Sequence, residues 1–112
     1  MSKKSVKEKE TMDVHNHNLN IHYSAPQHYW DQLAELYEKM PHWSGYHDNI
    51  PTWYGNDERI IDVSVEPSGL SFYAKLPQKE WEHWFSLFKQ EATKIMGYQV
   101  GEPEEDFDFV YF

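Results

Sequence analysis

The chain has 112 residues and no cysteine, and its 19 acidic residues outnumber 10 lysines and arginines, for a formal net charge of −9. This length predicts one small domain, and the missing cysteines exclude disulfides and thiolate zinc sites. No apolar run is long enough for a membrane span or signal peptide, so no membrane partner is expected and the cytoplasm is the expected location. The acidic balance argues against a nucleic-acid ligand, because phosphate binding depends on lysine and arginine, and it predicts a basic protein partner.

Residues 1–12 combine four lysines with two glutamates and few apolar side chains, which predicts a disordered basic arm. A single domain is then expected over residues 13–112. From Val14 to Tyr23, apolar side chains at positions 19, 21 and 23 alternate with polar ones. This period of two predicts a half-buried strand.

A helix start is predicted at Ser24, Pro26 and Gln27. The hydroxyl of Ser24 can cap the first turn, Gln27 can reach back to it, and Pro26 needs no amide there. The helix should run to about Met40, because the following proline ends it. Its expected buried stripe comprises Tyr29, Leu33, Leu36, Tyr37 and Met40.

Residues 41–57 fit neither a helical nor a strand period, so they predict a long loop. Four aromatic residues lie within it: Trp43, Tyr46, Trp53 and Tyr54. Such rings serve either as a small satellite of the core or as the buried centre of a protein interface.

A hairpin is predicted over Arg59–Glu66 and Leu70–Leu76, two runs rich in β-branched and aromatic residues. Pro67 and Ser68 lead to Gly69, which can adopt the positive φ that a tight turn needs. One face of each strand is apolar and should line the core: Ile61, Val63 and Val65 on the first, and Leu70, Phe72, Ala74 and Leu76 on the second.

A second helix is predicted from Pro77 to Met96, with Gly97 as its stop. Its apolar face comprises Trp81, Trp84, Phe85, Phe88, Ala92, Ile95 and Met96. After it, aromatic residues alternate with others at 107, 109 and 111, which favours a last short strand. The order strand, helix, strand, strand, helix and last strand predicts an α+β fold, a two-layer sandwich whose mainly antiparallel sheet carries two helices on one face.

No catalytic signature stands out, so the sequence predicts neither an enzyme nor a cofactor. His15 and His17 would share one strand face, which offers a metal ion at most a pair of ligands, and the ordinary alternative is an exposed polar strand start. Glu80 and His83 have the spacing of half a di-iron site, but the other helix lacks the matching residues, and a solvent-facing ion pair is the simpler interpretation.

An acidic row follows the second helix, with no lysine or arginine from residue 98 to the last residue. Its members are Glu102, Glu104, Glu105, Asp106 and Asp108. Such a row either imitates the charge of a phosphate backbone for a basic protein or keeps a small domain soluble. We expect these acids and the four loop aromatics to contact a partner.

The pattern from Gly69 onward resembles small immunity proteins encoded beside bacterial polymorphic toxins, of the contact-dependent inhibition and Rhs types. The resemblance is carried by Gly69-Leu70-x-Phe72, Trp81-x-x-Trp84-x-x-x-Phe88-Lys89-x-x-Ala92-Thr93 and Gly97-Tyr98-x-x-Gly101-Glu102-x-Glu104. It implies an inhibitor without catalytic residues that binds a cognate toxin, frequently a nuclease, in the cytoplasm. Two other hypotheses stay open: a small His-rich metal-binding domain or metal-dependent enzyme, and an adaptor for another basic protein.

Overall fold

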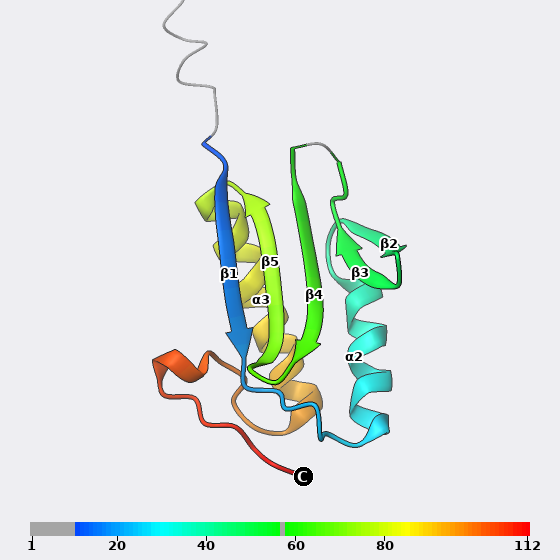
Figure 1. The fold of residues 1–112 in the computed structure, drawn as a ribbon, viewed down its shortest axis with the longest axis vertical. Coiled ribbons are helices and arrows are strands. Elements are labelled where there is room, and N and C mark those ends of the chain that lie inside the picture. Colours follow the sequence, from blue (N-terminus) through cyan, green and yellow to red (C-terminus); the bar gives the residue numbers. More distant parts are fainter. Residues whose placement is uncertain (1–10, 57) are drawn as a thin grey trace, which may run out of the picture.

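The computed structural model describes residues 11–56 and 58–112, where a five-stranded antiparallel sheet carries two helices on one face (Figure 1). This confirms the predicted α+β class. The predicted basic arm falls, over residues 1–10, outside the described residues. The elements are β1 (Asp13–Leu19), α2 (Gln27–Lys39), β2 (Trp43–His47), β3 (Ile50–Trp53), β4 (Ile60–Glu66), β5 (Gly69–Leu76), α3 (Gln78–Met96) and the 3-10 turn η1 (Pro103–Glu105).

The strands lie in the order β1-β5-β4-β3-β2, so β5 is flanked by β1 and β4. The register aligns His15 with Ala74, Ala74 with Ile61, and Ile61 with Trp53. All four side chains are buried, because this row faces the helices. One row therefore runs from a histidine at one side of the sheet to a tryptophan at the other.

The second layer forms as the helical periodicity predicts. In α3 the buried residues are Trp81, Trp84, Phe85, Phe88, Ala92 and Met96, and Ile95 packs against them while partly exposed. Gly97 ends the helix with φ 80°, which confirms its predicted role as the stop. No helix within the described residues is long and apolar enough to cross a membrane.

Helix α2 buries most of its predicted stripe, with Tyr29 only partly covered. Its start differs from the prediction. Ser24 does not cap the helix, because its hydroxyl donates a hydrogen bond of 2.7 Å to the ring of His22. The indole of Trp30 instead donates to the carbonyl of Ala25, at 2.9 Å, and ties the helix to the chain that precedes it.

The loop predicted for residues 41–57 is wrong, because β2 and β3 pair there as a hairpin. Asp48 and Asn49 form its two-residue turn with φ of 54° and 67°. Such a turn requires positive φ at both positions, which aspartate and asparagine tolerate. The alternation of apolar and polar residues that indicates strands is interrupted by a register shift between Trp43 and Gly45 and by Pro51 within β3.

The predicted last strand is also absent from the described residues: Val110 makes only an isolated parallel bridge with Ile21. The first strand likewise ends at Leu19 rather than at Tyr23. Beyond Leu19 the backbone bonds to Gly101 instead of to a sheet neighbour, since the amide of Asn20 donates to that carbonyl at 2.9 Å. The last residues therefore lie across the end of the sheet (Figure 1).

Gly69 is the first residue of β5, directly after the turn at Pro67 and Ser68, and has φ 117°, the positive value that the sequence predicts. A β-carbon there would collide with the carbonyl oxygen of Leu19. We expect Gly69→Ala to lower the free energy of unfolding by about 2 kcal/mol, measured by urea denaturation. Gly97→Ala is the control, because its φ is also positive but no atom lies within 4 Å of the added carbon. Equal losses of unfolding free energy for the two variants would show that the contact with the Leu19 carbonyl oxygen adds nothing to the cost at Gly69.

Candidate functional site

Four of the five predicted acidic residues are exposed on one short segment after α3: Glu104, Glu105, Asp106 and Asp108. Two of them lie in η1, and Asp106 ends that turn with φ 74°. The segment has no basic residue. These four residues, here called the acidic segment, create a concentrated negative potential at one end of the sheet.

Glu102, the fifth member of the predicted row, belongs to the interior instead. It is 9% exposed, and its Oε1 lies 2.7 Å from Nδ1 of His17 on β1. The expectation that Glu102 contacts a partner is therefore wrong, because its carboxylate is already used to join the segment to β1. Sequence spacing did not reveal this pair, since 85 positions separate the two residues.

Asn20 fixes the acidic segment to the body of the protein. Its side chain is 2% exposed, and it donates from Nδ2 to the carbonyls of Gln99 (3.1 Å) and Asp108 (3.0 Å). Its Oδ1 accepts from the amide of Gly101 at 2.8 Å. The hydroxyl of Tyr98 donates to the carbonyl of Asn20 at 2.9 Å, and burial raises the pKa of this phenol to about 12. The backbone that carries the acids is thus held by buried hydrogen bonds.

Exposed aromatic residues lie beside the acidic segment. The ring of His22 packs on Tyr23 at 4.2 Å and on Tyr111 at 4.7 Å between centroids, and Phe109 lies at 5.9 Å. Tyr23 and Tyr111 are 58% and 70% exposed. The sequence pattern predicted strands for these residues and did not indicate the cluster, because its members meet only where the segment after β1 lies beside the last residues.

The four aromatic residues predicted for the partner site have different environments. Trp53 is fully buried, and its indole donates to the carbonyl of Tyr37 at 2.9 Å, so it is a core residue and the prediction for it is wrong. Trp43 is partly buried and packs edge-on against Trp53 at 5.5 Å. Tyr46 is 51% exposed, and Tyr54 is partly buried against His42. Of the four, Tyr46 has the most exposed surface for a partner.

His15 and His17 share one face of β1, as predicted, but that face is the interior and not an exposed polar strand start. Their rings pack on Trp81 at 5.3 and 5.5 Å. His15 Nε2 lies 3.0 Å from the carbonyl of Leu76, to which it donates, and His17 bonds to Glu102. Within residues 11–56 and 58–112, no group of three or more histidine, aspartate or glutamate side chains is arranged to hold a metal ion.

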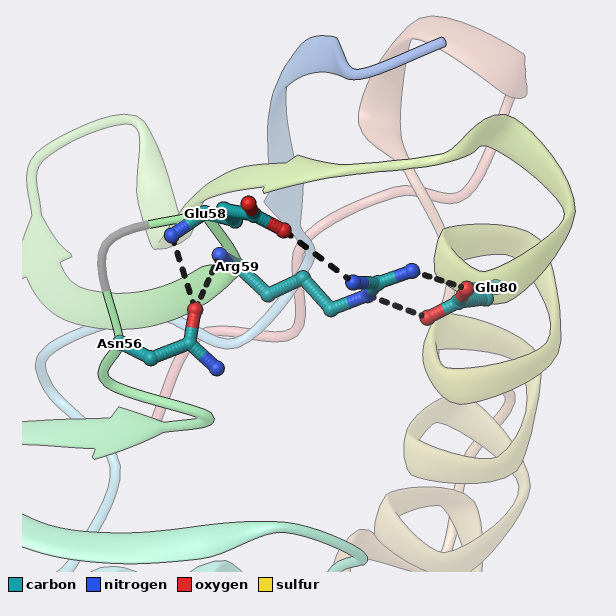
Figure 2. A network of polar contacts seen from close by, with 4 residues as sticks. All are labelled: Asn56, Glu58, Arg59 and Glu80. Carbon is teal, nitrogen blue, oxygen red and sulfur yellow. Dashed lines mark hydrogen bonds and ion pairs between the residues drawn. The ribbon is translucent and has the colours of Figure 1, made fainter. Parts of the chain in front are cut away.

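Glu80 makes an ion pair, in line with the simpler of the two interpretations of the Glu80 and His83 spacing. Arg59 donates from Nε and Nη2 to its two oxygens, both at 3.0 Å (Figure 2). This hydrogen bonding lowers the pKa of the Glu80 carboxyl. Asn56 Oδ1 accepts from the amides of Glu58 and Arg59, at 2.8 and 2.7 Å (Figure 2). The connection into β4 is thereby tied to the first turn of α3.

A pocket of about 400 Å³ opens beside this ion pair. Its lining includes His42, Tyr54, His83 and Trp84. His42 and Tyr54 have φ of 70° and 67°, stack at 4.1 Å and are joined by a 2.7 Å bond from the Tyr54 amide to the His42 carbonyl. Burial raises the pKa of the Tyr54 phenol above its ordinary value.

Comparison with known proteins gives one partial similarity. No family model matches the chain, and no solved structure matches it. The chain is 32% identical over 92 residues to ribosomal protein uS12 methylthiotransferase RimO of Symbiobacterium thermophilum. The match covers 82% of this chain but only 18% of that protein, so the similarity concerns a small part of the relative.

Proposed function

We propose that the protein is an immunity protein that binds a cognate bacterial toxin in the cytoplasm and neutralises it through the acidic segment. The single observation that carries the proposal is the exposure of Glu104, Glu105, Asp106 and Asp108 on backbone that Asn20 holds in place. A fixed row of carboxylates complements a basic surface without an ordering cost on binding. The resemblance of residues 69–104 to immunity proteins of polymorphic toxin systems supports the same function.

The toxin best suited to this surface is a nuclease, because a nuclease presents a basic surface to the phosphates of its substrate. Carboxylates placed opposite that surface steer the two proteins together and compete with nucleic acid for the same charges. Tyr23 and Tyr111, exposed beside the acids, supply the amphipathic rings that commonly dominate interface energies. Inhibition then consists of covering the toxin surface and requires no chemistry from the immunity protein.

The test removes charge at constant size. We expect the triple variant Glu104→Gln, Glu105→Gln and Asp108→Asn to associate with the cognate toxin at least about tenfold more slowly at low salt. The salt dependence of the association rate should also weaken. Stopped-flow kinetics at two salt concentrations measures both effects, and growth of cells that express the toxin measures protection.

A matched control variant neutralises three carboxylates at another surface, the exposed face of α2: Asp31→Asn, Glu35→Gln and Glu38→Gln. This variant has the same net charge, so it separates a local contact from a general effect of charge. Both variants should unfold within about 0.5 kcal/mol of the parent, because exposed charges contribute little to stability. Equal association rates for the two variants would contradict the acidic segment as the contact surface.

A further inference from the structure

On the side of β3, and within the described residues, strand β4 has no pairing partner along more than half of its length. All seven of its residues pair with β5, but in the described chain only Ile61 and Asp62 pair with β3. Residues 63–66 therefore have a strand on one side only, although β4 lies inside the sheet order. Figure 1 shows β4 continuing past β3 toward the β4–β5 turn, with no strand beside its end on that side.

The sequence of β3 explains why its pairing with β4 ends at Thr52. Continuing the register that pairs Thr52 with Asp62 would place Pro51 opposite Val63. Proline has no amide to donate, so it cannot continue a ladder. The next carbonyl, that of Ile50, already accepts a 2.9 Å bond from the hydroxyl of Thr52, and Asn49 turns the chain away with φ 67°. The gap is thus built into the β2–β3 hairpin.

An apolar groove of about 430 Å³ accompanies the unpaired residues. Its apolar walls come from α2, from the β3 end of the hairpin and from β4 itself: Trp30, Tyr37, Ile50, Pro51, Val63 and Val65. Ile50 and Val65 are 41% and 49% exposed at its rim. Unpaired backbone along an apolar groove is the arrangement that accepts an added strand.

The charge beside the groove indicates its occupant. Asp48, in the β2–β3 turn, and Glu66, at the end of β4, are both exposed. They are the chain neighbours of Asn49 and Val65, which line the groove, so they place carboxylates beside it. A strand bound here would be extended over four residues, about 13 Å. It would present apolar side chains to the groove and a basic residue to these carboxylates.

We propose that residues 63–66 of β4 receive an extended strand of the toxin, which pairs with the β4 backbone and places apolar side chains in the groove beside Val65 and Ile50. This inference rests on the proposed function and specifies how the toxin is held. The acidic segment then accelerates encounter, while the added strand slows dissociation. Variants of the acidic segment should therefore change the association rate constant, whereas variants of the groove should change the dissociation rate constant.

The decisive variant is Val65→Lys, with Ile50→Lys as a second one on the opposite rim, because both positions are exposed enough to leave the fold intact. Each adds a positive charge and a long side chain where an apolar strand that carries a basic residue would lie. We expect dissociation of the toxin complex to become about tenfold faster or more. Val14→Lys is the matched control, since Val14 is a 59% exposed valine on the far side of the sheet, and it should leave dissociation unchanged.

Amide hydrogen exchange supplies the second measurement. Alternate amides among residues 63–66 should exchange faster in the free protein than those of β5, and they should become protected in the complex. A complex that leaves these amides unprotected, or that tolerates both lysine variants, would overturn the added strand while keeping the proposed function. Failure of the toxin to bind at all would overturn both. If protection of these amides rises with the concentration of the free protein, residues 63–66 pair with a second copy of the chain, and the proposal of a toxin strand is overturned.

Discussion

Replacement of Phe88 by alanine is expected to lower the free energy of unfolding by roughly 3–5 kcal/mol, a large part of the stability of a small domain. Phe88 is fully buried where α3 meets β5 and α2. Its ring lies 5.0 Å from that of Phe72, 5.8 Å from Trp84 and 6.2 Å from Tyr37, between centroids. These large rings cannot close the space left by a truncated side chain, so the variant retains a cavity. Urea denaturation followed by tryptophan fluorescence measures the loss.

Two further variants keep this result interpretable if Phe88→Ala does not fold. Phe88→Leu retains most of the apolar volume and should show a smaller loss in the same direction. Leu87→Ala removes an aliphatic side chain from the neighbouring, partly exposed position, and should cost less than Phe88→Ala. Unchanged stability of Phe88→Ala would show that this face of α3 is not the core.

The second large effect is expected at Asn20, whose replacement by alanine should cost about 3 kcal/mol. Its side chain serves the buried amide of Gly101 and the carbonyls of Gln99 and Asp108. Removing the amide group leaves these partners without their bonds, and each buried group left unsatisfied costs about 1–3 kcal/mol, not fully additively. Chemical denaturation measures the total loss.

The same variant links stability to function. Loss of the Asn20 bonds should increase amide exchange in residues 99–108. Under the proposed function it should also weaken toxin binding, although the Asn20 side chain is buried. Asn16→Ala is the matched control, an exposed asparagine within β1 that should change neither quantity. A stable Asn20→Ala protein with unchanged exchange would contradict the role of this residue in holding the acidic segment.

Short-range features were predictable because their causes are local. The faces of α2 and α3 follow from apolar residues at helical spacing, and the β4–β5 turn follows from the need for positive φ at Gly69. The β2–β3 hairpin was missed although its signal is also local. Asp48 and Asn49 form a standard two-residue turn, but a bulge at Gly45 and the proline in β3 interrupt the alternation that would have indicated strands.

The α+β class, the two helices, the β4–β5 hairpin and the acidic composition of the last residues follow from the sequence alone. Which acids are exposed depends on the tertiary fold, since Glu102 is buried against His17 while Glu104 lies in solvent. The contact of His15 with Trp81, and the hydrogen bond between Asn20 and Gly101, 81 positions apart, also depend on it. Periodicity is set by neighbours within a few residues, whereas the burial and pairing of polar groups depend on which distant segments the sheet brings together.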